Sequence, residues 1–563
     1  MVSPMMTTRL HSICMSIALC VGLLIASGCA ATPPPVGGLR FANRLPVWLV
    51  NDQAQLIVPP AARGFPKLKY YFDRFFYRPV VRSMEVRSSP HAQNVNSLDE
   101  VPNSTWFTNR IGRGGLSAEE VRIGLSQVAR LGKPQRLRVT GTKVGGKSPG
   151  LLYLDEQGAK YILKFDETGQ PEMETGADIV AQRLLWAAGF NVPDDNVIIF
   201  RREQLVLADD AKIRDTFGNK RPMTNADLEA TLALLEVQAD GSYRGLASRF
   251  LPGFPIGGIA PEGTRSDDPN DVVPHQHRRE LRGQYVFFSW LNHTDVKQDN
   301  TLDMYDPKAG YVTHYLVDFG KALGSLGWIE SREEDGFAYS MDVKYIVTSL
   351  LTLGVWRRPW EGADGAQPSG ERYLGVGRFE SKEFTADGWK PAYPWEPFNH
   401  IDRFDGFWAA KIVARFRPEH IRAAVMAAQY SSKKTSDYIV RTLIERQSIV
   451  VRHWFANVSA LDEFSMDGDK LCFSDLNTQH QSVVGPTETA ITASLYGHTG
   501  RLRGRAVVAH SAGARFCADV GEIADYTIVR FRSKVAGAGT RTMDVHLNVG
   551  ASAVPQVIGL ERH

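Results

Sequence analysis

The pattern of apolar and polar positions predicts an ordered core that begins near residue 138. Five short runs have the residue types of strands, and one longer run has apolar residues at helical spacing. In chain order these elements are expected at 138–140, 151–154, 161–165, 177–188 (the helix), 197–200 and 204–207. The last two runs predict a hairpin. The order is therefore three strands, a helix and two further strands.

Farther along the chain the spacing becomes helical and then returns to alternation. Helices are predicted over 276–292, 405–428 and 435–455. From about residue 464 apolar and polar positions alternate, and Gly-rich turns separate the runs. Strands are expected at 470–474, 490–496, 506–510, 526–535 and 543–549. The tail over 464–563 therefore predicts a small β-sandwich.

Residues 39–137 have a less regular pattern and are expected to form an N-terminal extension of mixed short elements. Their most apolar stretch is an aromatic cluster at 70–77. Aromatic side chains at near-helical spacing are most often part of a core. The cluster is therefore assigned no functional role.

The first residues of the chain have the pattern of an export signal. An apolar run over 13–25 is too short to span a membrane comfortably and fits the hydrophobic region of a secretory signal peptide. The small residues before Cys29 resemble a bacterial lipobox, with Ala26 where leucine is commoner. We expect a signal peptide over 1–28 and, over 29–38, a lipidated Cys29 with a Pro-rich tether. An ordinary signal peptide is the alternative.

Lipidation would anchor the mature chain to a bacterial membrane. By resemblance to known bacterial sorting, Ala30 after Cys29 implies the outer membrane. Two of the other four cysteines lie within the expected signal peptide, so only Cys472 and Cys517 remain besides the lipid site. In an oxidising compartment these two residues pair into a disulfide, and two unpaired buried thiols are the alternative.

Composition narrows the class of protein. The chain has 563 residues, enough for several domains, and its 43% hydrophobic and 23% charged residues are ordinary for globular proteins. Its net charge is +3, and no long Lys/Arg block is present. Nucleic acid is therefore not expected as a partner.

The most specific motif of the chain lies between His293 and Gly320. Residues 293–300 have the pattern H-x-D-x-K-x-x-N, and D-F-G follows at 318–320. This pair of motifs is typical of the nucleotide site of kinase-like phosphotransferases.

Each polar side chain of these motifs has a distinct task in phosphoryl transfer. Asp295 accepts the proton of the attacking hydroxyl, and Lys297 meets the γ-phosphate. Asn300 and Asp318 hold Mg²⁺ from two sides. His293 is expected to be a structural residue near Asp318 and not a proton carrier.

Residues upstream of the motif supply the rest of a nucleotide site. Lys164 ends the third predicted strand, where it would pair with the α- and β-phosphates. Its acidic helix partner is Asp178 or, four residues earlier, Glu174, and the position of the helix end favours Asp178. A Gly-rich loop between the first two strands would wrap phosphates with backbone N–H groups or serve only as a turn. The loop residues assigned to phosphate are Gly145, Gly146 and Lys147.

The order of these motifs resembles the atypical kinase-like proteins, which include the HipA toxin kinases, phosphatidylinositol 3/4-kinase relatives and spore-coat CotH kinases. The phrase Leu163-Lys164-Phe165, followed by the residues at 177–189, is most similar to a HipA-type N-lobe. The resemblance covers about 138–455. It implies an α+β two-lobe core, with an N-lobe over 138–210 and a C-lobe over 211–460.

The same resemblance implies the cofactors ATP and Mg²⁺, bound by Lys164, Asn300 and Asp318, with Asp295 as the base. No Ala-Pro-Glu motif follows Asp318, so the peptide-docking segment of ordinary protein kinases is not expected.

These features together predict a lipid-anchored protein of the bacterial cell envelope with a kinase-like core and a C-terminal β-sandwich. Its expected activity is phosphoryl transfer from ATP·Mg²⁺ to the hydroxyl of an unknown protein or small-molecule acceptor. The alternative is a catalytically silent kinase fold that serves as a binding or scaffold lipoprotein. Retention of Lys164, Asp295, Asn300 and Asp318 together favours the active enzyme.

Overall fold

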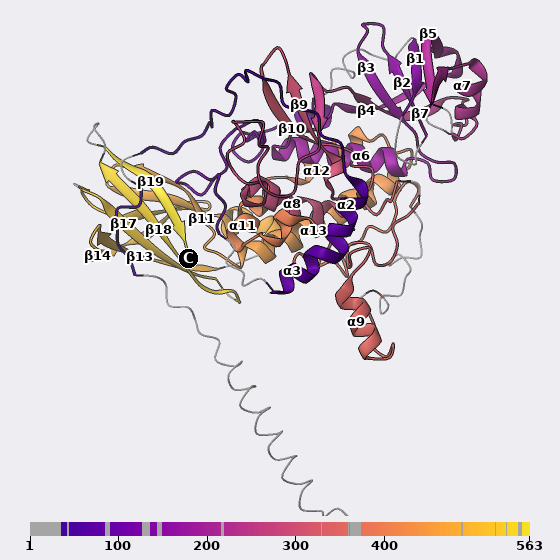
Figure 1. Ribbon diagram of the computed structural model, residues 1–563. Coiled ribbons are helices and arrows are strands. Elements are labelled where there is room, and N and C mark those ends of the chain that lie inside the picture. The colour runs from indigo at the N-terminus through magenta and orange to yellow at the C-terminus, as the bar shows by residue number, and fades with distance from the viewer. Residues whose placement is uncertain are drawn as a thin grey trace, which may run out of the picture.

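A sheet-rich lobe, a helical lobe and a C-terminal β-sandwich make up the protein (Figure 1). The computed structural model describes residues 35–41, 44–84, 90–125, 136–143, 149–214, 219–327, 329–358, 360, 373–485, 488–523, 525–535, 537–549 and 554–563. The hydrophobic clusters are built from residues after position 35. The expected signal peptide and Cys29 lie outside the described residues.

A seven-stranded mixed sheet forms the smaller lobe. Its strands are β1 (Leu137–Thr142), β2 (Gly150–Leu154), β3 (Lys160–Lys164), β4 (Asp195–Phe200), β5 (Leu205–Arg214), β6 (Lys220–Pro222) and β7 (Tyr243–Arg249). They lie side by side in the order β4-β7-β3-β2-β1-β5-β6. Alternate side chains of β1, β2 and β3 are buried and pack against α7 (Asn225–Leu232). α6 (Met173–Ala188) lies beneath the sheet, and all of its residues except Trp186 are buried.

Two features of this lobe correct the sequence prediction. β4 and β5 do not form a hairpin, because β4 pairs with β7 and β5 lies parallel to β1. The sheet also continues past residue 210, because β7 lies between β3 and β4 and ends at Arg249. Alternation along a strand indicates which side chains are buried, but it does not indicate the partner strand.

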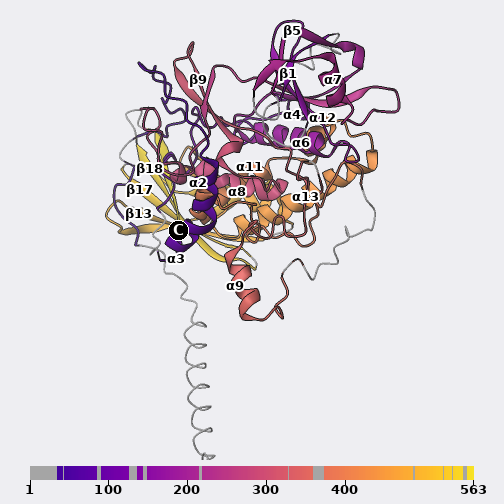
Figure 2. The ribbon, with the colours of Figure 1, turned by 45° about the vertical axis from the view of Figure 1, so that its right-hand side comes forward.

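Helices and a small sheet form the larger lobe around one core. The helices are α8 (Arg279–Leu291), α10 (Glu396–Asn399), α11 (Arg403–Ala414), α12 (Pro418–Ala427) and α13 (Lys433–Phe455), with α9 (Val343–Leu351) projecting from the lobe (Figure 2). The small sheet contains β8 (Phe254–Gly257), β9 (Thr301–Asp306) and β10 (Tyr311–Leu316). The single helix predicted over 405–428 is two helices, because the chain turns at 415–417 and Pro418 begins α12.

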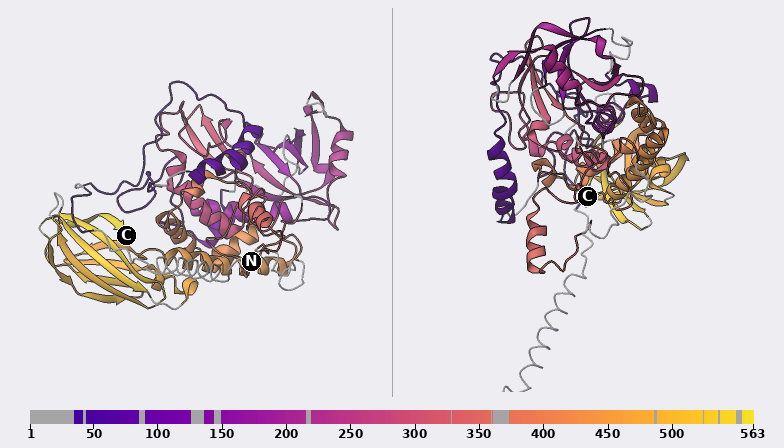
Figure 3. Two further views of the ribbon diagram at one scale, coloured as in Figure 1. Left: turned by 60° about the horizontal axis from the view of Figure 1, so that its bottom comes forward. Right: turned by 90° about the vertical axis from the view of Figure 1, so that its right-hand side faces the viewer.

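The N-terminal extension runs along the helical lobe (Figure 3). It contains α2 (Lys67–Phe72), the π-helical turn η1 (Asp73–Tyr77), α3 (Arg78–Met84) and α4 (Ala118–Ile123). The aromatic cluster expected in the core is only partly there: Tyr70 is buried, whereas Phe72, Phe76 and Tyr77 are exposed. In the described part of the chain, no helix is long and apolar enough to cross a bilayer.

Two antiparallel sheets form the C-terminal β-sandwich. One contains β11 (Leu461–Asp467), β12 (Lys470–Asp475), β16 (Arg515–Asp519) and β15 (Val508–Ala512). The other contains β14 (Leu502–Ala506), β13 (Thr489–Gly497), β17 (Thr527–Val535), β18 (Gly539–Val549) and β19 (Pro555–Arg562). Two short helices, α14 (Leu476–Gln479) and α15 (Gln481–Val484), follow β12. Leu471 and Phe473 pack with Phe531 and Val545 across the sheets, which confirms the predicted sandwich.

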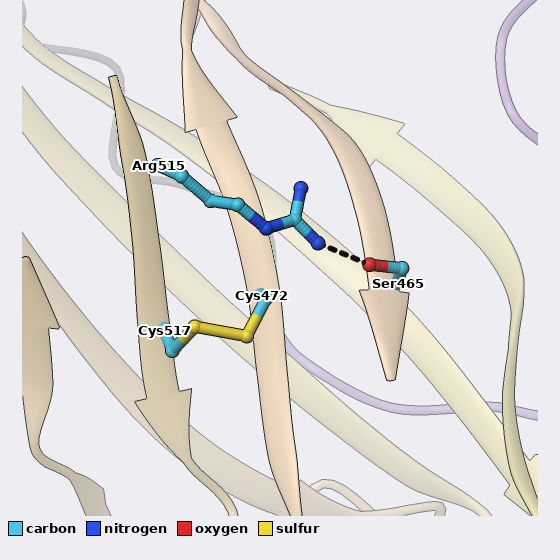
Figure 4. The surroundings of a disulfide bond; sticks show 4 residues. All are labelled: Ser465, Cys472, Arg515 and Cys517. Carbon is cyan, nitrogen blue, oxygen red and sulfur yellow. Dashed lines mark hydrogen bonds between the residues drawn. A yellow bond between two sulfur atoms is a disulfide. The ribbon is translucent and has the colours of Figure 1, made fainter. Parts of the chain in front are cut away.

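A disulfide joins Cys472 on β12 to Cys517 on β16 (Figure 4). The two residues are directly opposite in the antiparallel pair, and their Cα atoms are 4.0 Å apart. Nearby, Nη2 of Arg515 donates to Oγ of Ser465 at 2.6 Å. Of the two alternatives that the sequence leaves open, the structure has the bonded pair.

Candidate active site

The β9–β10 hairpin brings the H-x-D-x-K-x-x-N and D-F-G motifs together. α8 ends at Leu291, and Asn292 turns the chain with a φ of +49°. The loop then reaches η4 (Gln298–Asn300), directly before β9. β10 returns the chain, so that the N–H of Val317 donates to the carbonyl oxygen of Asn300 at 3.1 Å. Asp318 follows immediately and therefore lies beside the loop.

Asp295 uses its two carboxylate oxygens differently. Its Oδ2 accepts hydrogen bonds from Nζ of Lys297 and Nζ of Lys321, each at 2.8 Å, and from Nδ2 of Asn300 at 2.9 Å. Its Oδ1 is buried and has no hydrogen-bond partner among the described residues. Burial alone would raise the pKa of Asp295, but the charges of Lys321 and Lys297 lower it below the usual value. The side chain is therefore an ionised carboxylate with one oxygen held and the other available.

Lys164, at the end of β3, bridges two carboxylates. Its Nζ lies 3.3 Å from Oδ2 of Asp178 on α6 and 3.0 Å from Oδ1 of Asp318. Burial would lower the pKa of Lys164, but the charges of Asp318 and Asp178 raise it well above the usual value. The charge of Lys164 in turn lowers the pKa of Asp318. Burial raises the pKa of Asp178, and Lys164 opposes that rise. Lys164 is therefore a fixed ammonium group between the two lobes.

Glu174 and Asp178 both lie next to the D-F-G turn, but they contact different groups. α6 begins at Met173, four residues before the predicted start at residue 177, so Glu174 lies in its first turn. A Cβ atom on Gly320 would be only 2.6 Å from Cγ of Glu174. A side chain at position 320 would therefore displace Glu174, whereas Asp178 makes the ion pair with Lys164.

Asn300 and Asp318 provide oxygen ligands of the kind that Mg²⁺ prefers. The amide nitrogen of Asn300 donates to Asp295, which leaves its Oδ1 as the available acceptor. Asp318 has a left-handed φ of +65°, and its side chain is 49% exposed. Two protein ligands suit Mg²⁺ that is also bound by substrate phosphates and water. Within the described ranges, no group of three or more His, Cys, Asp or Glu side chains is arranged to hold a metal ion.

The predicted phosphate loop, with Gly145, Gly146 and Lys147, lies outside the described residues. The strands on either side, β1 and β2, pair antiparallel. Lys143 directly follows β1, and burial together with the nearby charge of Lys164 lowers its pKa.

His293 has a packing role. Its ring lies 4.8 Å from that of Phe288 and 5.9 Å from that of Phe319, measured between centroids. Burial lowers the pKa of His293 to about 4. The ring is therefore neutral at physiological pH and packs beside Phe319 of the D-F-G turn.

Three features of the site have no counterpart in the sequence prediction. Lys321 donates a hydrogen bond to Asp295. Its position directly after D-F-G in the sequence is the one signal that could have identified it. Asp195, at the start of β4, is a further buried carboxylate, and its negative charge raises the pKa of Lys164. Tyr71 of α2 lies 5.2 Å from Tyr393, measured between ring centroids, and Nζ of Lys297 is 6.0 Å from the centroid of Tyr393. These rings come from distant segments, so no local pattern joins them.

The arrangement defines a kinase-like two-lobe fold. Lys164 on the third strand pairs with Asp178 of α6. The loop over 293–300, here called the catalytic loop, and the D-F-G turn lie in the helical lobe. No protein-family model matches the chain, and no curated protein sequence matches it.

Solved kinase structures are similar to this chain at low identity. The Helicobacter pylori proinflammatory kinase CtkA is 9% identical, with a TM-score of 0.31 over 57% of this chain and 96% of that chain. A Golgi casein kinase is 10% identical, with a TM-score of 0.28 over 73% of this chain and 95% of that chain. A Golgi casein kinase structure with Mn/ADP bound is 9% identical, with a TM-score of 0.22 over 56% and 75%. At these identities the roles of individual residues rest on the geometry of this chain alone.

Proposed function

We propose that this protein is a phosphotransferase that moves the γ-phosphoryl group of ATP to an acceptor hydroxyl. The observation that carries the proposal is the hydrogen bonding of the Asp295 carboxylate. Three donors saturate its Oδ2, and its buried Oδ1 has no partner among the described residues. Buried carboxylate oxygens are normally hydrogen-bonded, so an unused oxygen beside two lysines is suited to a ligand.

The charged groups divide the reaction between them. The acceptor hydroxyl donates to Oδ1 of Asp295, and its oxygen attacks the γ-phosphorus while its proton passes to that carboxylate. The bond between the γ-phosphorus and the β,γ-bridging oxygen breaks, and ADP leaves with that oxygen. Lys164 contacts the α- and β-phosphates, and Lys297 contacts the γ-phosphate. Mg²⁺, held by Asn300 and Asp318, would neutralise charge on the β- and γ-phosphates.

The second part of the proposal is export and lipid anchoring at Cys29. The lipobox-like residues before Cys29 support it, and so does the Cys472–Cys517 disulfide, because such bonds persist in oxidising compartments. A bacterium that expresses the gene should incorporate labelled palmitate into the protein. Cys29→Ser should abolish that label, and retention of the label would refute anchoring at this residue.

Nucleotide binding tests the proposed function directly. ATP with Mg²⁺ should stabilise the protein by about 2.7 kcal/mol at a hundredfold excess over Kd, because the ligand binds only the folded state. The measurement is the shift of the thermal transition with and without Mg²⁺ and ATP. Asp318→Ala should lose the shift, whereas Asp467→Ala, at an exposed position in the β-sandwich, should keep it. Absence of any shift in the unmodified protein would leave a kinase fold that serves as a scaffold.

Lys321 should set the acidic limit of activity. Its charge lowers the pKa of Asp295, so Lys321→Met should raise that pKa and leave Asp295 protonated at pH values where it is now ionised. The acidic limb of the kcat profile should therefore move to higher pH. Lys308→Met, at an exposed turn of the β9–β10 hairpin, is the matched control and should not move it. An unchanged limb in Lys321→Met would show that Lys321 does not tune the base.

A further inference from the structure

Two helical segments expose apolar faces at the same end of the helical lobe. The segment 67–84 combines α2, η1 and α3, and the segment 343–358 begins with α9. The views in Figure 1, Figure 2 and Figure 3 agree that α9 projects from the lobe and that α3 ends toward the same side. Neither segment lies under another part of the described chain at its outer face, as the exposed side chains show.

The segment 67–84 has one anchored face and one bare face. Nη1 of Arg74 is buried and lies 3.3 Å from Glu262 and 3.4 Å from Glu396, which fixes the segment to the helical lobe. The bare face contains five large apolar side chains spaced four residues apart, each between 49% and 87% exposed. They are Leu68, Phe72, Phe76, Val80 and Met84.

α9 repeats this arrangement on a second element. In the described part of the chain none of its side chains is buried. Its apolar residues are between 43% and 81% exposed, namely Val343, Ile346, Val347, Leu350 and Leu351. Its base is fixed by Tyr345, whose hydroxyl donates to the carbonyl oxygen of Phe337 at 3.4 Å and whose ring centroid lies 4.4 Å from Nζ of Lys390. The helix is therefore held at its base while its outer face meets water.

Among the described residues of the two segments, the exposed charged side chains are positive. They belong to Lys67, Lys69, Lys344, Arg357 and Arg358. Asp73 is the only acidic residue in either segment, and Arg74 and Arg78 already lie 3.7 Å and 3.4 Å from it. The whole chain has a net charge of only +3, so positive charge is concentrated on these two segments.

We propose that segments 67–84 and 343–358 dock the protein on an anionic lipid bilayer. Apolar side chains on a projecting helix, flanked by lysine and arginine, fit the interface of a bilayer, where the apolar face enters and the cations meet acidic headgroups. A protein partner would require a complementary groove for such convex elements. The bilayer accepts them without one.

The docking segments are also linked to the loop around Asp295 through residues 390–393. Tyr71 and Phe75 pack on Tyr393 at 5.2 Å and 5.9 Å between ring centroids. In the same short stretch, the N–H of Ala392 donates to the carbonyl oxygen of Thr294 at 2.8 Å, and Lys390 contacts α9. One loop therefore links both docking segments to the residue that precedes Asp295. Docking would hold the candidate active site at a fixed position relative to the membrane surface.

Vesicle co-sedimentation tests the proposal on residues 35–563, which contain the hydrophobic clusters of the structure but neither the expected signal peptide nor Cys29. The protein should bind vesicles of phosphatidylcholine with phosphatidylglycerol, bind phosphatidylcholine alone more weakly, and lose binding as salt rises. Phe72→Glu/Phe76→Glu and Leu350→Glu/Leu351→Glu should each weaken binding about tenfold or more. Unchanged binding in both double variants would overturn the proposal.

The β-sandwich offers a matched control. Leu502→Glu/Val507→Glu adds the same two charges at exposed apolar positions that are remote from both segments, and it should leave vesicle binding unchanged. Equal loss in this variant would show a non-specific effect of charge and would refute the assigned surface. Light scattering tests the other occupant, a second copy of the chain. A dimer that dissociates in the Phe72→Glu/Phe76→Glu variant would assign the face to self-association and overturn membrane docking.

Discussion

Asp295→Asn should reduce phosphoryl transfer by about 10²–10⁴-fold and leave nucleotide binding intact. The amide keeps the size of the side chain but cannot take the proton of the acceptor hydroxyl. Asp295 is buried, and its Oδ2 is held by three donors, so its replacement removes the base without opening a cavity. The measurement is kcat for ATP-dependent transfer, or for ATP hydrolysis when water is the acceptor.

The thermal shift with Mg²⁺ and ATP separates a lost base from a lost fold. It should be the same in Asp295→Asn and in the unmodified protein, because Lys164, Asn300 and Asp318 remain. Asp299→Asn is a matched control, since it changes the same residue type in the same loop at an exposed position. Full activity in Asp295→Asn would refute the assigned base, even if nucleotide binding is retained.

The sequence predicted the parts of the site that are local in the chain. The catalytic loop and D-F-G lie within 293–320, and a single hairpin closes the distance between them. Lys164 ends β3, a strand that its alternating buried and less buried positions mark, and α6 is the next element along the chain. Chemistry that depends on such short-range spacing can be read from residue order, because the intervening turn and hairpin allow few arrangements.

The parts that the sequence did not predict depend on contacts between distant segments. Lys321 could be seen after D-F-G, but its bond to Asp295 depends on how the D-F-G turn lies against the catalytic loop. β7 reaches the sheet of β3 after about eighty residues, so its pairing has no local signature. The aromatic residues at 70–77 have helical spacing, and the spacing alone does not indicate which face meets the lobe and which meets water.

The difference between local pattern and long-range contact also explains which strand and helix limits differ from the prediction. The predicted β-sandwich was found because alternation marks five of its strands, but β11, β14, β16 and β19 were not predicted. β16 is short and only one of its side chains is fully buried, so its hydrophobic pattern is weak. The break between α11 and α12 was missed because apolar residues continue through the turn, where Phe416 is fully buried. Hydrophobic pattern reports burial, and burial continues through a turn that lies inside the protein.

A buried ion network behind α8 links that helix to α11. Asp405 on α11 is fully buried; its Oδ1 accepts from Nε of Arg279 and its Oδ2 from Nη1 of Arg282, each at 3.1 Å. Both arginines are themselves buried on α8, the helix that ends directly before the catalytic loop. Removal of the carboxylate would leave the desolvated guanidinium group of Arg282 without its anion, whereas Arg279 keeps its ion pair with Asp99.

Asp405→Ala should therefore lower the free energy of unfolding by about 3–5 kcal/mol, because breaking a buried pair leaves an uncompensated charge. Urea unfolding followed by tryptophan fluorescence measures it, since Trp290 and Trp408 are buried in the same core. Asp437→Ala is the matched control: Asp437 also pairs with two cations, Lys433 and Arg422, but on the surface. The control should cost at most about 1 kcal/mol. Equal losses in the two variants would show that burial adds nothing to the network, and that α8 is held in place by apolar packing alone.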